Sequence, residues 1–151
     1  MEIENIYINA WRDIPDDYYI ITDVTDKINN IIENYLTDPE WKKVSESDYI
    51  NKIFRFKDEV KNGSPIDIKN RPEWYKPLYI YNNEIIDLDA LGNILFGVLG
   101  AYLNLSYAEL YVGASAAQTM DNGHLSLDDP SDVARWMQGI DLYTEWLKGE
   151  D

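Results

Sequence analysis

The sequence contains no cysteine and only one histidine among its 151 residues. The lack of cysteine excludes a disulfide framework, thiolate metal sites and cysteine nucleophiles. A single histidine cannot form a histidine cluster for zinc, nor supply the paired histidines of a ribonuclease-type mechanism. A catalyst of that kind would need Lys, Asp or Tyr for one of its two proton-transfer roles.

Basic residues are scarce as well, because 13 Lys and Arg side chains stand against 28 Asp and Glu, a formal net charge of −15. Affinity for nucleic-acid phosphate comes mainly from Lys and Arg, so such a surface repels it by default. The acidic surface suits a basic protein partner. The alternative is that the charge only keeps the protein soluble.

The N-terminus lacks a signal peptide, because residues 1–19 are acidic and contain neither a basic region nor an apolar run. No segment is long and apolar enough to span a membrane. The sequence therefore predicts a cytoplasmic protein, unless a delivery system that needs no signal peptide secretes it.

The longest part with few charges covers residues 87–118. Its apolar residues recur at helical spacing and predict a buried helix over about residues 91–103, with Asn104 as its stop. Gly97 and Gly100 lie three residues apart on one face of that helix, where the missing side chains let another backbone come close.

A second helix is predicted over about residues 106–118, because Ser106 and Glu109 form a capping-box pattern. These two glycine-rich helices should pack closely at the centre of the molecule. We expect one domain over residues 1–151, mainly α with a small β hairpin, forming a compact bundle around this pair. Residues 1–53 would form an N-terminal helical part with short strands.

Short β elements are expected in three places. Residues 2–9 suit a short strand or an arm, and residues 18–21 suit a second strand. Asn82-Asn83 suits the turn of a hairpin over residues 78–86.

Further helices surround the central pair in this prediction. One begins at Asp23 or Thr25 and is ended or interrupted by Asp38-Pro39. Another begins at Ser47, with an inward face made of Tyr49 or Ile50, then Ile53, Phe54, Lys57 and Val60. The last, capped by Asp129 or Ser131, should turn inward Val133, Trp136, Met137, Ile140, Tyr143 and Leu147.

Four blocks appear in a characteristic order: VKNGSPIDIKNRPEW, then DALGNILFG, then GASAAQ, then DDPSDVARWMQGIDLY. This order resembles the polymorphic toxin type 44 domain, a C-terminal toxin module of bacterial secreted effectors. The resemblance covers roughly residues 54–147. It implies a role in bacterial antagonism, a hydrolase supposed to cleave RNA, and a cognate immunity protein as partner.

The chain departs from that family pattern in two places, which cover three residues. Leu95-Phe96 stands where the family tends to have His-Tyr, and Ile66 stands where it tends to have Trp. An alkyl side chain has no titrating group, so Leu95 cannot act as an acid or base. The alternative function is a non-catalytic acidic protein, immunity-like or resembling a phage inhibitor. Such a protein would engage a basic target, in some cases by mimicking nucleic-acid charge.

Asp128, Asp129 and Asp132 form an acidic turn at the start of the last predicted helix. One interpretation is helix capping, because the helix dipole favours negative charge there. The other is a site for a divalent cation, or a buried carboxylate that orients a catalytic base. Arg135 would offset the repulsion between these carboxylates and is a candidate for substrate binding. No other cofactor is expected.

Asp67 and Lys69 are predicted to project from one side of an extended loop. They form either a weak surface ion pair or a catalytic pair. In a catalytic pair Asp67 acts as the base and Lys69 stabilises an oxyanion.

His124, Asn93 and Gln118 complete the set of candidates. His124 can approach the acidic turn as a catalytic group, or it is a plain surface residue. Asn93 and Gln118 either bind substrate or satisfy backbone groups near the glycines.

Overall fold

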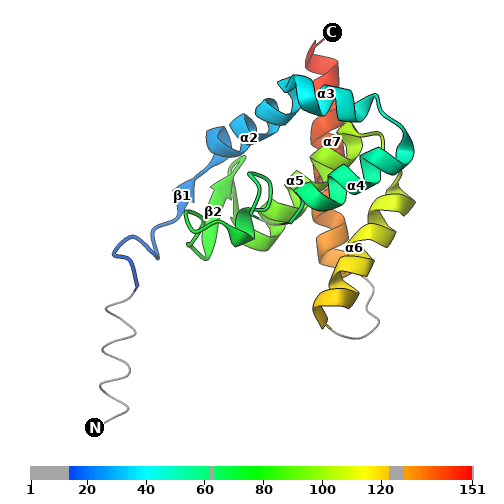
Figure 1. Cartoon of the computed structure of the whole chain (residues 1–151). Helices are drawn as coiled ribbons and strands as arrows, with labels where there is room; N and C mark the ends of the chain where they lie inside the picture. The colour runs from blue at the N-terminus through cyan, green and yellow to red at the C-terminus, as the bar shows by residue number, and fades with distance from the viewer. Residues whose placement is uncertain (1–13, 62, 123–127, 151) are drawn as a thin grey trace.

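The computed structural model describes residues 14–61, 63–122 and 128–150, with the backbone alone described for residues 116–122 and 150. Its elements, in chain order, are β1 (Thr22–Asp23), α2 (Thr25–Thr37), α3 (Pro39–Ser45), α4 (Tyr49–Glu59), the 3-10 helix η1 (Ile68–Asn70), β2 (Leu78–Tyr81), β3 (Glu84–Asp87), α5 (Leu88–Tyr102), α6 (Tyr107–Asn122) and α7 (Pro130–Glu150). Figure 1 shows helices dominating the described chain, which confirms the mainly α class with a small β part. Over these residues, no helix combines the length and apolar character that crossing a membrane requires.

Aspartates define where several helices begin. The side chain of Asp38 accepts a hydrogen bond from the Glu40 amide at the start of α3, so Asp38-Pro39 separates α2 from α3. The side chain of Asp87 likewise accepts from the Ala90 amide, 2.7 Å away, at the start of α5. Each of these carboxylates satisfies an amide that the helix itself leaves unpaired.

The small sheet has the order β1-β2-β3. β2 and β3 form the expected antiparallel hairpin, and its two turn residues, Asn82 and Asn83, have φ of 50° and 65°. Asparagine tolerates this left-handed conformation, which two-residue hairpin turns require. β1 pairs in parallel with β2.

The prediction of a strand over residues 18–21 was wrong. The Tyr18 amide donates to the Pro15 carbonyl and the Ile20 amide donates to the Asp17 carbonyl, each at 3.0 Å, so the chain turns there. Pairing begins only at Thr22. The element expected over residues 2–9 lies outside the described residues.

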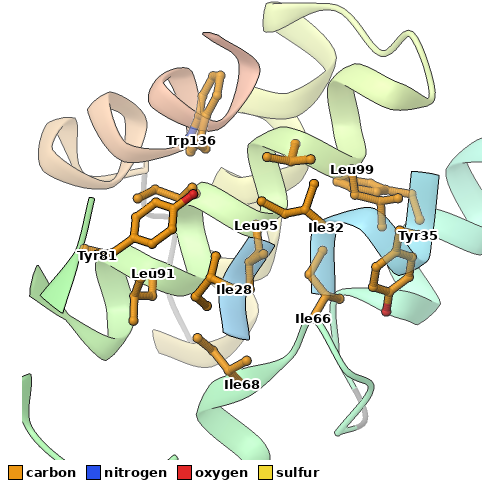
Figure 2. Close-up of a cluster of buried hydrophobic side chains, with 14 of the residues drawn as sticks. Ile28, Ile32, Tyr35, Ile66, Ile68, Tyr81, Leu91, Leu95, Leu99 and Trp136 are labelled. Carbon is orange, nitrogen blue, oxygen red and sulfur yellow. The ribbon is translucent and has the colours of Figure 1, made fainter. Parts of the chain in front are cut away.

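The core surrounds α5. Its side chains Leu91, Ile94, Leu95 and Leu99 are almost completely buried, and Figure 2 shows three of them among side chains from other helices and the hairpin. α5 ends where Asn104 adopts a φ of 59°, as its assignment as a stop predicted. The capping box is also present, because the Glu109 side chain accepts from the Ser106 amide and the Ser106 hydroxyl accepts from the Glu109 amide.

The backbone that approaches Gly97 belongs to α7, not to α6 as the sequence suggested. A Cβ atom added at Gly97 would lie 1.9 Å from the Trp136 carbonyl oxygen. A Cβ atom added at Gly139 would lie 2.0 Å from the Ile94 carbonyl oxygen. Gly100 instead accommodates the Leu110 side chain of α6. Two glycines, one on each helix, therefore allow α5 and α7 to cross in direct contact, as Figure 1 illustrates.

The predicted inward face of α4 was mostly wrong. Phe56 is its buried residue, and the Phe56 ring packs 5.0 Å from the Phe96 ring of α5, measured between centroids. Ile50 is 67% exposed and Phe54 is 70% exposed. Only Ile53 and Val60 of the predicted face contribute to the core, both partly buried. The apolar stripe read from the sequence therefore faces solvent.

The last helix buries one narrow stripe. Trp136 is fully buried, and Val133, Ile140 and Tyr143 pack against the core. Met137 and Leu147, which were also expected to face inward, are exposed.

Candidate functional site

A surface hollow of about 390 Å³ lies where the loop after η1 meets the start of α5. Aromatic and charged side chains line it together: Tyr18, Lys69, Trp74, Tyr75, Lys76, Pro77, Asp87, Leu88 and Asp89. The hollow is shallow and largely open to solvent, and its lining places aromatic side chains beside two lysines and two aspartates.

Lys69 is anchored to the first turn of α5. Its ammonium nitrogen lies 2.7 Å from a carboxylate oxygen of Asp89, with both side chains more than half exposed. Its side chain passes over Gly92, where an added Cβ would lie 4.0 Å from the Lys69 Cε atom. The position of the lysine is therefore set by α5 and not by its own loop.

Asp132, in the first turn of α7, is influenced by the charges of Lys69 and Asp89. Burial is the main reason why the pKa of the Asp132 carboxyl is raised above its ordinary value of 3.8. The negative charges of Asp128 and Asp129 raise this pKa further, as does that of Asp89. The Lys69 ammonium lowers the pKa of Asp132. Lys69 of η1 and Asp89 of α5 are therefore near enough to Asp132 of α7 for their charges to affect its pKa. We call these three residues the charged cluster.

Arg135 does not neutralise the acidic turn as the sequence suggested. Its guanidinium lies 2.9 Å from a carboxylate oxygen of Glu84 and 3.2 Å from the Gln138 side-chain oxygen. The Arg135–Glu84 contact links α7 to β3, one helical turn after Asp132.

Asp128 is a buried anchor. It is only 8% exposed, and one of its carboxylate oxygens accepts a hydrogen bond from the Trp136 indole nitrogen at 3.0 Å. Its backbone amide donates to the buried Ser115 hydroxyl on α6. A buried polar group needs such partners, and here they join α6 to α7.

Asp129 caps α7. Its carboxylate accepts from both the amide and the hydroxyl of Ser131, and these bonds lower the pKa of Asp129. This confirms the capping interpretation for this residue. Among the described residues, no group of three His, Cys, Asp or Glu side chains is arranged to hold a metal ion.

Asp67 and Lys69 do not share a face. η1 turns the segment into a 3-10 helix where an extended loop was expected, and Asp67 is buried at its start. A carboxylate oxygen of Asp67 accepts from the Gly63 amide and the Asn70 side chain, at 2.9 Å and 2.8 Å. Asp67 therefore organises its own loop, while Lys69 reaches α5.

The amide candidates differ in what the structure describes. The Asn93 side chain donates to the Asp89 carbonyl, one turn earlier on α5, at 3.0 Å. Gln118 lies in α6, but its side chain is outside the described residues, as is the whole of His124.

Sequence reasoning missed Asp89. It also missed the N-terminal residues near Asp17 that contact the wall of the hollow. The Tyr75 hydroxyl donates to the carboxylate of Asp17, and the Lys76 ammonium lies 3.4 Å from that carboxylate and bonds Thr22. The pattern Asp87-Leu88-Asp89 at a helix start was a usable signal, because it places two carboxylates at the N-cap and in the first turn of α5. The contacts with Asp17 join residues far apart in the sequence, and no sequence signal predicted them.

The two departures from the family pattern lie side by side in the core. Ile66 and Leu95 line the same interior gap of about 10 Å³, together with side chains of α2 that include Tyr35. Figure 2 shows both within the buried cluster, with Ile66 next to Tyr35. The position at which the resemblance predicted a histidine is therefore filled by a buried leucine of the core.

Comparison with known proteins identifies the family. No match was found among curated proteins or among solved structures. A family model described as bacterial toxin 44 matches residues 41–145, which include every member of the charged cluster. Because this match spans more than half of the 151 residues, the chain belongs to the bacterial toxin 44 family.

Proposed function

We propose that this member of the toxin family is a hydrolase that cleaves RNA at the charged cluster. The observation that carries the proposal is that the Lys69–Asp89 ion pair lines the hollow and that both charges affect the pKa of Asp132, although the three residues come from separate elements. A carboxyl group whose pKa is perturbed by burial and by nearby charges is typical of catalytic sites.

Each member of the cluster has a distinct role in this proposal. Asp132 accepts the proton of a ribose 2′-hydroxyl, since its raised pKa makes it a stronger base than an ordinary aspartate. The 2′-oxygen then bonds to phosphorus, the bond to the 5′-oxygen breaks, and the 5′-oxygen takes a proton from water. Lys69 stabilises the negative charge that develops on the phosphoryl oxygens. Asp89 holds the Lys69 ammonium in place.

Basic side chains around the hollow partly offset the acidic surface. Lys69 and Lys76 line it, and the Lys27 ammonium lies 4.5 Å from the centre of the Trp74 ring beneath it. Tyr75 provides an exposed ring on which a base can stack. Trp74 itself is buried and packs in the core.

The test is cleavage of labelled RNA by the purified chain. Asp132→Asn should lower the rate by about 100-fold or more, and Lys69→Met by a similar factor. The matched controls are Asp141→Asn, an exposed aspartate of α7, and Lys43→Met, which removes an exposed Lys–Glu pair on α3. Both controls should cleave at the wild-type rate. Intact RNA with the wild-type chain, or full activity in Asp132→Asn, would contradict the proposal.

A second candidate, an acidic binding protein with a basic target, is favoured by the apolar filling of positions 66 and 95. At position 95 a leucine, which cannot titrate, stands where the resemblance predicts a histidine. The two candidates separate on expression in bacteria. The hydrolase should arrest growth, and Asp132→Asn should relieve the arrest. The binding protein should accumulate harmlessly and cleave neither RNA, DNA nor cell wall.

A further inference from the structure

A carboxylate from the N-terminal segment contacts two side chains that line the hollow. The Tyr75 hydroxyl lies 2.8 Å and 2.7 Å from the two carboxylate oxygens of Asp17, and the Lys76 ammonium lies 3.4 Å from one of them. Asp17 precedes Tyr75 by 58 residues, so the fold, and not the local sequence, creates this contact. The Lys76 side chain is only 11% exposed, and the charge of a partly buried group is less screened by water and salt.

These contacts stabilise the ionised form of Asp17. The hydrogen bond from Tyr75 is the main reason why the pKa of the Asp17 carboxyl lies below its ordinary value of 3.8, and the Lys76 ammonium lowers this pKa further. The Lys76 ammonium also bonds the Thr22 hydroxyl, which helps to hold it in place. A hydroxyl donor and a partly buried ammonium that stabilise the same anion form an anion-binding site. We call Tyr75 and Lys76 the anion subsite.

The segment that supplies Asp17 is weakly attached to the body of the protein. Among the described residues, Asp17 makes the hydrogen bonds and the ion pair that join residues 14–21 to the rest of the chain. Tyr19 and Ile20 are 65% and 61% exposed, so this segment buries little apolar surface. Figure 1 shows it leading into β1 at the edge of the molecule. Because a segment with few buried contacts opens at little cost in free energy, Asp17 can leave the subsite while the fold stays intact.

We propose that the anion subsite binds a phosphate group of the RNA strand, and that Asp17 occupies the subsite in the free protein as an internal competitor. This inference rests on the proposed function. Lys69, which would stabilise the reacting phosphoryl group, lines the same hollow as Lys76. One strand would therefore contact both lysines, with the reacting phosphate at Lys69 and another phosphate at the subsite. Binding displaces residues 14–21, so the N-terminal segment lowers the affinity for RNA.

The remaining negative charges act on every form of the protein alike. In the hollow, the Asp87 carboxylate accepts a hydrogen bond from the Ala90 amide, and the Asp89 carboxylate pairs with Lys69. These two carboxylates and the net charge of −15 oppose the binding of any nucleic acid. A valid test therefore compares two variants that change the net charge equally and differ only in whether the subsite loses its competitor.

Asp16 and Asp17 provide this matched pair. Alanine at either position removes one negative charge from the same segment, but Asp16 is exposed and does not line the hollow. The probe is a fluorescein-labelled single-stranded oligodeoxynucleotide, whose binding is followed by fluorescence anisotropy. It has the phosphates of a nucleic-acid strand but no 2′-hydroxyl, so the proposed reaction cannot cleave it.

Asp17→Ala should bind this probe about five- to tenfold more tightly than Asp16→Ala, because only the first variant removes the competing carboxylate. Adding Lys76→Met to each variant should abolish the difference, since the subsite then lacks its ammonium in both. In the wild type, the probe should shift the NMR signals of the amides of residues 17–21 as the segment leaves the subsite. In cleavage of labelled RNA, Asp17→Ala should have a KM lower than that of Asp16→Ala by the same factor.

Three results would overturn the inference. The first is equal affinity of Asp17→Ala and Asp16→Ala for the probe, and the second is no binding by Asp17→Ala at up to about 1 mM probe. The third is displacement of residues 17–21 by inorganic phosphate at the concentrations at which the probe acts, which would make a free phosphate ion the ligand.

A failure of the hydrolase proposal gives a different result. The wild type would then leave RNA intact, while Asp17→Ala would still bind the uncleavable probe more tightly than Asp16→Ala. Conversely, RNA cleavage with the same KM in both aspartate variants would support the hydrolase and contradict the anion subsite.

Discussion

Replacing Gly97 by alanine should destabilise the protein, although alanine is the better helix former. The added Cβ would lie 1.9 Å from the Trp136 carbonyl oxygen, 2.7 Å from the carbonyl carbon and 3.0 Å from Cα. All three atoms belong to the backbone of α7, so no side-chain rotation can remove the overlap. Widening the first contact to 3.0 Å requires α5 and α7 to separate by about 1.1 Å, the difference between 3.0 and 1.9.

Two opposing terms set the magnitude. Removing a glycine from a helix interior stabilises by about 1 kcal/mol. Overpacking a close contact costs roughly 1–3 kcal/mol, and the upper end applies because the obstacle is rigid. The net expectation for Gly97→Ala is a loss of about 2 kcal/mol in the free energy of unfolding. Gly139→Ala should lose a similar amount, since its Cβ would meet the Ile94 carbonyl oxygen at 2.0 Å.

Urea unfolding followed by circular dichroism would measure these differences, and two other glycines provide controls. An added Cβ at Gly113 of α6 or Gly149 of α7 meets nothing within 4 Å. Alanine at Gly113 should therefore stabilise by up to about 1 kcal/mol, and less at Gly149 because it lies near a helix end. The double variant at Gly97 and Gly139 should lose less than the sum of the single losses, because both open one contact. Stabilisation by Gly97→Ala comparable to that by Gly113→Ala would refute the reasoning.

Three further variants test the core and the charged cluster. Asp128→Ala should lower the free energy of unfolding by roughly 1–3 kcal/mol, because the buried Trp136 indole loses its acceptor, and Asp128→Asn should lower it less. Leu95→His should destabilise by about 2–4 kcal/mol in urea unfolding and give no faster RNA cleavage, because it buries an imidazole in a gap of about 10 Å³. For Asp132, the folded pKa is above the unfolded one, so the wild type loses stability as pH rises through the interval between them. Asp132→Asn should therefore be more stable than the wild type at pH 7, and this difference should vanish below the ordinary aspartate pKa of 3.8, as pH-dependent urea curves would show.

Local signals in the sequence were sufficient for most of the elements. The Asn82-Asn83 turn, the Ser106–Glu109 capping box and the break at Asp38-Pro39 all appear as predicted. Each of these features is satisfied by atoms a few residues away, so the sequence alone contains the necessary information.

The packing partners could not be read in the same way. Gly97 shows that a backbone can approach, but nothing near it in the sequence names α7 as the neighbour. In α4 the regular stripe of Ile50 and Phe54 outweighed the single Phe56, which is the residue that the fold buries. A periodic pattern reports that a face is apolar, and only the tertiary structure decides whether the chain itself covers it. An apolar face left in solvent against a clear pattern is also where an interaction surface is expected.

The candidate site was predicted in part, for a similar reason. Lys69 and Asp132 were named from the loop and the acidic turn that contain them, and the charge of Lys69 lowers the pKa of Asp132. Asp67, two residues from Lys69, instead bonds within its own loop. The 3-10 helix that turns it there was not indicated by any periodicity in the sequence. Asp89, which pairs with Lys69, was absent from the prediction because its partner comes from a different element.

The glycine contact and the charged cluster are physically linked. Asp89 lies on α5 and Asp132 on α7, and the crossing at Gly97 and Gly139 is the place where these two helices touch backbone to backbone. A separation of about 1 Å there would displace one carboxylate relative to the other and to Lys69, and a misplacement of that size lowers catalytic rates by about 100-fold. Folded Gly97→Ala should therefore cleave RNA far more slowly than its residual stability explains, while Gly113→Ala should cleave at the wild-type rate. Equal cleavage by both folded variants would mean that the two helices do not act together on a substrate.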